Sequence, residues 1–119
     1  MADTRRKLGQ WGEAQARRYL EACGCQVVAT NWRCTAGEVD LVVREGAWLA
    51  FVEVRTRRGR AYGTPEESIT AAKLAHMAAV AESYVYEEGW EGDWRLDVVA
   101  ILARRGQAPQ IEWYKSVSQ

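Results

Sequence analysis

Two runs of alternating residues, separated by a short break, constrain the fold of this chain more than any other feature. The runs cover residues 37–44 and 48–55, and Glu45-Gly46 lies between them. Alternation with a period of two is typical of β-strands, and a Glu-Gly pair suits a tight turn. The sequence therefore predicts a β-hairpin at the centre of the fold.

Charged side chains gather at one end of this predicted hairpin. Residues two apart share a face of a strand, so one face carries Glu38, Asp40, Glu53 and Arg55. A turn centred on Glu45-Gly46 would place Asp40 opposite Phe51 and diagonal to Glu53. Carboxylates this close repel each other unless a cation lies between them, and Mg²⁺ or Mn²⁺ prefers oxygen ligands. The alternative interpretation is cross-strand ion pairing on a solvated sheet face.

Length and composition set the class of protein. With 119 residues and 48% hydrophobic residues, the chain is expected to fold as one domain, residues 1–119. Lys+Arg and Asp+Glu both number 16, so the net charge of zero argues against a uniformly basic surface but allows a local basic patch. The sequence has neither an apolar run of the roughly 20 residues that a membrane span needs nor a signal-peptide pattern. We therefore expect a cytoplasmic protein without a membrane partner.

Helical and strand periodicities flank the hairpin. The expected elements are helices at 4–22 and 64–88 and strands at 26–33, 94–102 and 110–114. The second helix is expected to begin with Thr64 as N-cap and Glu67 in a capping box, and to end at Gly89. Asp97 interrupts an apolar strand and is expected to pair with Arg95 or with a helix group. The order α-β-β-β-α-β-β predicts an α/β fold with a mixed central sheet flanked by helices.

The charged residues also carry a family resemblance. Asp40, followed in the next strand by Glu53-Val54-Arg55, resembles the PD-(D/E)xK motif of the restriction-endonuclease-like nucleases. The wider pattern resembles the YraN-like family of uncharacterised bacterial proteins and covers most of the chain. The matching pieces are residues 9–19, Asn31-Trp32-Arg33, residues 37–41, residues 51–55, Gly63-Thr64-Pro65, Lys73 and residues 95–99.

The resemblance implies both a fold and an activity. It implies a restriction-endonuclease-like core and a Mg²⁺-dependent endonuclease that hydrolyses phosphodiester bonds, with structured DNA as substrate by analogy with Holliday-junction resolvases. Asp40 and Glu53 would hold the metal, and the Val54 carbonyl would complete the site. Glu38 and Glu13 would be accessory ligands. One site per small chain implies a homodimer if two strands are cut.

Two charged residues bear on whether such a site is active. The motif has lysine where this chain has Arg55, and arginine keeps its positive charge but is not readily deprotonated. Lys73 lies within the apolar arc of the second helix, where it either extends to solvent or meets an anion. By the resemblance, it would supply the charge of the missing lysine.

Glu13 also has two interpretations. It is either a solvated helix charge that pairs with Arg17 at i+4 or, by the resemblance, an extra metal ligand on the first helix.

Arginines follow the second strand of the hairpin. Arg57, Arg58 and Arg60 form a basic loop beside the predicted metal site. Arg33 lies at the end of the strand predicted at 26–33, before the hairpin. Such runs are usually solvated, but here they are placed to bind the phosphate backbone of a nucleic acid. A rival interpretation, favoured by Arg55, is a non-catalytic module that binds nucleic acid or protein and keeps the nuclease fold.

Overall fold

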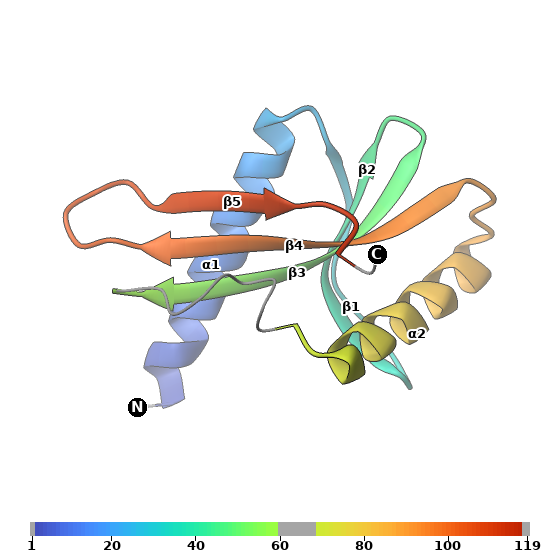
Figure 1. Ribbon diagram of the computed structural model, residues 1–119, viewed down its shortest axis with the longest axis horizontal. Coiled ribbons are helices and arrows are strands. Elements are labelled where there is room, and N and C mark those ends of the chain that lie inside the picture. Colours follow the sequence, from blue (N-terminus) through green and yellow to red (C-terminus); the bar gives the residue numbers. More distant parts are fainter. Residues whose placement is uncertain (1, 60–68, 118–119) are drawn as a thin grey trace.

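The computed structural model, described for residues 2–59 and 69–117, has a five-stranded sheet with one helix on each face (Figure 1). Its elements are α1 (Ala2–Ala22), β1 (Gln26–Cys34), β2 (Gly37–Glu45), β3 (Trp48–Arg58), α2 (Ala71–Glu88), β4 (Asp93–Ala103) and β5 (Gln110–Tyr114). This order, α-β-β-β-α-β-β, confirms the predicted α/β class and is consistent with a nuclease-like core.

The sheet follows the chain in spatial order, β1-β2-β3-β4-β5. Strands β3 and β4 are parallel, and the other neighbours are antiparallel. A parallel pair needs a crossover connection, and α2 lies in that connection. The result is a mixed sheet in which β3, the second strand of the hairpin, lies at the centre.

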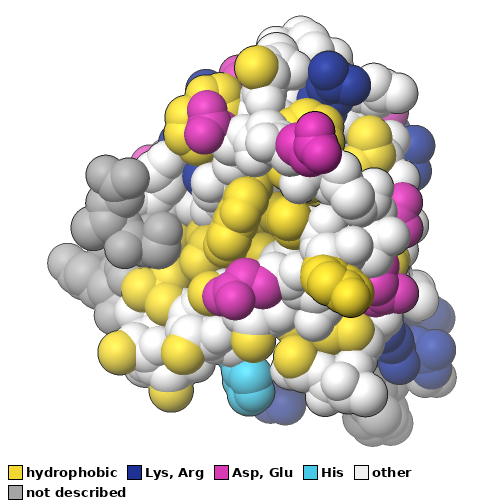
Figure 2. Space-filling model, turned by 90° about the vertical axis from the view of Figure 1, so that its right-hand side faces the viewer, with side chains coloured by type: hydrophobic (Ala, Val, Ile, Leu, Met, Phe, Trp, Pro, Cys, Tyr) yellow, Lys and Arg dark blue, Asp and Glu magenta, His cyan; other side chains and the backbone are white. Residues whose placement is uncertain are grey.

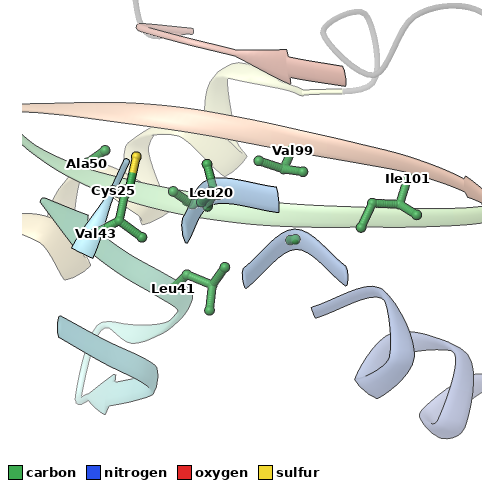
Figure 3. Packing of buried hydrophobic residues seen from close by; sticks show 9 residues of the cluster. Leu20, Cys25, Leu41, Val43, Ala50, Val99 and Ile101 are labelled. Atoms are coloured by element: carbon green, nitrogen blue, oxygen red, sulfur yellow. The ribbon is translucent and has the colours of Figure 1, made fainter. Parts of the chain in front are cut away.

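Two hydrophobic cores cover the two faces of the sheet. On one face, Leu20 of α1 packs among side chains such as Val43 and Val99 (Figure 3). On the other face, Met77, Val80 and Tyr84 of α2 pack on residues that include Val42 and Phe51. Burying a side chain of this size contributes about 1.5–3 kcal/mol. Both faces of the hairpin are therefore fixed by helices.

The register of the hairpin differs from the prediction. Glu45 pairs with Trp48, so the turn consists of Gly46-Ala47 rather than Glu45-Gly46, and Val42 instead of Asp40 faces Phe51. Gly46 takes a φ of 60° in the first turn position, where glycine carries no steric penalty. The two-residue shift leaves the strand faces unchanged. In this register, Asp40 and Glu53 lie next to the Leu41–Val52 pair, at the end of the ladder farthest from the turn.

Helix α2 begins later than the sequence predicts. Its N-cap is Thr70, whose Oγ1 accepts a hydrogen bond from the Lys73 backbone N–H at 3.1 Å. The predicted cap at Thr64 and Glu67 lies outside the described residues. The helix ends, as predicted, before Gly89 in a left-handed conformation. Neither helix in the described ranges is long and apolar enough to cross a bilayer.

Asp97 has the structural role that the sequence predicts. Its side chain is fully buried and accepts hydrogen bonds from Arg95 Nε at 3.0 and 3.1 Å. It also accepts from Trp113 Nε1 and from the Ser116 backbone N–H, both at 3.0 Å. A buried carboxylate with this many donors is satisfied, so Asp97 joins β4, β5 and the segment after β5.

Candidate active site

A cavity of about 610 Å³ opens where the hairpin ladder ends. Helix α1, strands β2 and β3 and the first turn of α2 all contribute to its walls. Its charged lining consists of Arg5, Glu13, Glu38, Asp40, Glu53, Arg57, Arg58 and Lys73. We call it the acidic cavity, because it gathers all four carboxylates that the sequence analysis assigned to a metal site.

Asp40 is held at a break in strand alternation. Val39 and Val42 both pack with the α2 core, whereas Leu41 packs with the α1 core. On β1, the pairing residues on either side leave Asn31 opposite Asp40, and Asn31 has a φ of 50°. Asparagine tolerates this left-handed conformation better than most residues. The Val54 backbone N–H donates to Asp40 Oδ2 at 2.8 Å and fixes the carboxyl against β3.

The environment of Asp40 disfavours its charge. Burial raises the pKa of this carboxyl from 3.8 to about 7, although the hydrogen bond from Val54 opposes the shift. The neighbouring charges of Glu53, Glu13 and Glu38 contribute smaller parts of the same rise in pKa. A half-buried carboxyl among other carboxylates is the arrangement that a bound cation stabilises.

Glu13 belongs to the same electrostatic group. Burial raises its pKa, a hydrogen bond with Asn31 opposes the shift, and the charges of Glu38 and Glu53 add to it. The alternative partner, Arg17, lies instead 3.3 Å from Glu21. Glu13 therefore faces the acidic cavity, as the metal-ligand interpretation requires, and does not form the expected i+4 ion pair.

Two cations meet the carboxylate of Glu53. Lys73 Nζ lies 3.3 Å from Glu53 Oε2, so the lysine on the buried arc of α2 meets an anion. Arg55 Nε lies 3.2 Å from the same oxygen but is buried without a hydrogen-bond partner in the described part of the chain. Lys73 lines the acidic cavity and Arg55 does not.

The described arginines that were predicted to bind the phosphate backbone of a nucleic acid lie in two places. Arg57 and Arg58 line the acidic cavity, as their place after β3 predicts. Arg33 lies at the surface, with a side chain 77% exposed, and pairs with Glu38 at 3.0 Å. Arg60 lies outside the described residues.

The donor chemistry of the acidic cavity suits a hard divalent cation. Carboxylate and carbonyl oxygens are the ligands that Mg²⁺ and Mn²⁺ prefer, and Asp40, Glu53 and Val54 supply them at the end of the ladder. Within the described ranges, no three acidic, histidine or cysteine side chains already enclose a metal-sized site. A metal bound by Glu53 would compete with the two cationic side chains beside its Oε2.

Sequence reasoning missed two residues of the site. Arg5 lines the acidic cavity, and its spacing of eight residues from Glu13 on one helix face was an available signal. Asn31 was singled out only together with Trp32 and Arg33, as a piece of the family pattern and a candidate substrate contact, yet it binds Glu13 and lies opposite Asp40. Only its tolerance of positive φ hinted at this role.

Comparison with known proteins agrees with the resemblance noted in the sequence. The model of the uncharacterised protein family UPF0102, the YraN family, matches residues 12–101. A UPF0102 protein of Herpetosiphon aurantiacus is 42% identical over 123 residues, covering 99% of this chain and 98% of the relative. UPF0102 proteins of Roseiflexus castenholzii and Pelotomaculum thermopropionicum are 47% and 44% identical, covering 94% and 98% of this chain and 93% and 98% of the relatives. The chain belongs to the UPF0102 family.

Proposed function

We propose that the protein is a metal-dependent endonuclease that hydrolyses phosphodiester bonds of structured DNA. One observation carries the proposal: Asp40 and Glu53 meet Glu13, Glu38 and Lys73 in a single cavity. A purely structural role offers no reason to gather mutually repelling carboxylates around a half-buried Asp40, because the repulsion and the partial desolvation cost stability. A cation-dependent activity gives a reason for that cost.

The roles of the residues follow from their chemistry. Asp40 and Glu53, with the Val54 carbonyl, would hold Mg²⁺ or Mn²⁺, and Glu13 and Glu38 would hold its water ligands. The bound ion would supply Lewis acidity toward the phosphate and a more acidic water. Lys73 would move from Glu53 to the phosphate oxygens, where its charge opposes the negative charge that develops during hydrolysis.

Substrate placement follows from the arginines. Arg57 and Arg58 lie beside the carboxylates and would hold phosphates that flank the scissile bond. Structured DNA remains the substrate class by analogy with the resolvases, and it would be met in the cytoplasm. Cutting two strands would require two sites, hence a homodimer.

The test combines metal binding with cleavage. Wild type should bind Mn²⁺ in calorimetry and cut branched DNA, whereas Asp40→Asn and Glu53→Gln should do neither. Glu82→Gln is the matched control, since Glu82 is an exposed carboxylate of α2 that does not line the cavity. Cleavage by Asp40→Asn at the wild-type rate would refute the proposal.

A non-catalytic nucleic-acid-binding module is the second candidate. It is favoured by Glu53, whose carboxylate already has Lys73 and Arg55 beside it. Such a module would bind DNA equally well in EDTA and in Mn²⁺, and would leave it uncut across branched, flapped and single-stranded substrates.

A further inference from the structure

A second cavity, of about 910 Å³, lies on the other flank of α1. It is bounded by the first half of α1, the end of β3 and the turn between β4 and β5. The charged and aromatic side chains of its described lining are those of Lys7, Trp11, Arg58, Arg104 and Arg105. We call it the basic cavity.

The charge of this cavity is uncompensated. Among the described residues, its lining contains four cationic side chains and no carboxylate. None of the four has a carboxylate partner in the described part of the chain. Arg104 is nevertheless held in place, because Nε and Nη2 donate to the Ala108 carbonyl at 3.2 and 2.8 Å. Like charges gathered this way repel each other, and an anion with several oxygens would relieve the repulsion.

The basic cavity lies on a different side of the molecule from the face shown in Figure 2. On the face shown in Figure 2, hydrophobic and acidic side chains occupy the centre, and Lys and Arg lie toward its edges. That face is the right-hand side of Figure 1, whereas the β4–β5 turn projects at the left. In a chain with zero net charge, the four cationic side chains of its described lining give the basic cavity a local attraction for anions.

The two cavities are adjacent. Both include Leu8 and Arg58 in their walls. Between them α1 approaches β3 so closely that a Cβ at Gly12 would lie 2.9 Å from Thr56 Cβ. A polymer of phosphates that binds in both cavities would pass Arg58, which lines both.

Trp11 offers an aromatic surface to a nucleobase, which a free phosphate ion does not have. Its side chain is half-buried against the α1 core and also lines the basic cavity. A fixed aromatic surface beside cations is the combination that binds single strands, where an unpaired base stacks on the ring. Bases in a duplex have no free face to offer.

We propose that the basic cavity binds a single-stranded nucleic-acid segment, with phosphates on Lys7, Arg58, Arg104 and Arg105 and an unpaired base on Trp11. The inference rests on the proposed function for one point, that the segment flanks the phosphate in the acidic cavity. The substrate would then carry unpaired nucleotides next to its cleavage point.

The first experiment measures binding without metal. A short labelled oligothymidylate is titrated in EDTA, with fluorescence anisotropy as readout, against wild type and Lys7→Glu/Arg105→Glu. We expect at least about tenfold weaker binding by the variant and a salt dependence smaller by about 1.4, since each lost single-strand phosphate contact removes about 0.7 from the slope. Arg17→Glu/Arg18→Glu is the control, because it makes the same charge change on exposed positions of α1 outside both cavities.

The second experiment tests the base contact. Wild type should bind oligothymidylate about tenfold more tightly than an abasic strand of equal length, and Trp11→Leu should bind both equally. Thermal unfolding checks that each variant is folded, and the abasic comparison within one variant is independent of small stability changes.

Several results would overturn the inference: no binding by wild type in EDTA, equal losses in the cavity and control variants, tighter binding of duplex than of single strand, or no preference over the abasic strand. These outcomes are separate from the proposed endonuclease activity. Asp40→Asn should abolish cleavage in Mn²⁺ while leaving oligothymidylate binding in EDTA intact, so either idea can fail alone.

Discussion

Gly12 sets how closely α1 approaches the central strand, and its substitution is the most direct test of the architecture. A Cβ placed on Gly12 would overlap Thr56 Oγ1 and lie 2.9 Å from Thr56 Cβ and 3.0 Å from its Cγ2. Rotating the threonine can move Oγ1 away, but Thr56 Cβ cannot move by rotation. In Gly12→Ala, α1 must therefore move away from β3.

The magnitude follows from two opposing terms. Overpacking of a close contact costs about 1–3 kcal/mol, and replacing glycine by alanine within a helix contributes about 1 kcal/mol in the other direction. We expect Gly12→Ala to lower the free energy of unfolding by up to about 2 kcal/mol. Gly9→Ala is the matched control on the same helix, since no atom lies within 4 Å of the position that its Cβ would take. It should raise the free energy of unfolding by up to about 1 kcal/mol.

The assay is urea unfolding at a fixed temperature, with the double variant Gly12→Ala/Thr56→Ala completing a cycle. Removing Oγ1 and Cγ2 of Thr56 should make the Gly12→Ala change less costly than in wild type. The reasoning is refuted if Gly12→Ala is as stable as Gly9→Ala, or if the two sites show no coupling.

Three further predictions concern the charged residues. Because the pKa of Asp40 is raised from 3.8 to about 7, the folded protein binds the extra proton between these values. Wild-type stability should therefore fall as the pH rises through this window, relative to Asp40→Asn, by at most about 4 kcal/mol in unfolding experiments. Asp97→Ala should cost about 3–5 kcal/mol, because it removes one of the two carboxylates paired with the buried Arg95 and leaves the N–H donors of Trp113 and Ser116 without this acceptor; a loss under about 1 kcal/mol in urea unfolding would contradict the network. If the protein cuts DNA, Lys73→Met should lower the cleavage rate about 100-fold or more, whereas Arg55→Lys should change it little, and the reverse order would assign the catalytic cation to Arg55.

Much of the secondary structure could be predicted from the sequence, because short-range periodicity largely determines where strands and helices form. Alternation in residues 37–44 and 48–55 predicted β2 and β3, and the final strand, Gln110–Tyr114, matches its predicted range. The predicted register of the hairpin was wrong, because the sequence allows a turn at either Glu45-Gly46 or Gly46-Ala47. The choice between them depends on strand twist and on cross-strand packing, which a short window does not contain.

The composition of the candidate site was more predictable than its connections. Carboxylate spacing and the family resemblance singled out Glu13, Glu38, Asp40 and Glu53, which all reach the acidic cavity. The role of Asn31 was not predictable, because it depends on a left-handed residue on β1 that lies opposite a break in β2. The basic cavity was equally hidden, since its cations come from α1, β3 and the β4–β5 turn and become neighbours only after folding.

The position of α2 changes the interpretation of Arg55, the arginine at the motif position. Arg55 follows Glu53 by two residues on β3, so the two side chains lie on one face of the strand, yet Arg55 stays outside the cavity lining. Lys73 approaches the same carboxylate from the first turn of α2 and does line the cavity. A strand position and a helix position thus present two cations to one carboxylate, and only the lysine lines the cavity. Under the proposed function, the loss of lysine from the strand motif therefore does not leave the site without a lysine, because α2 supplies one.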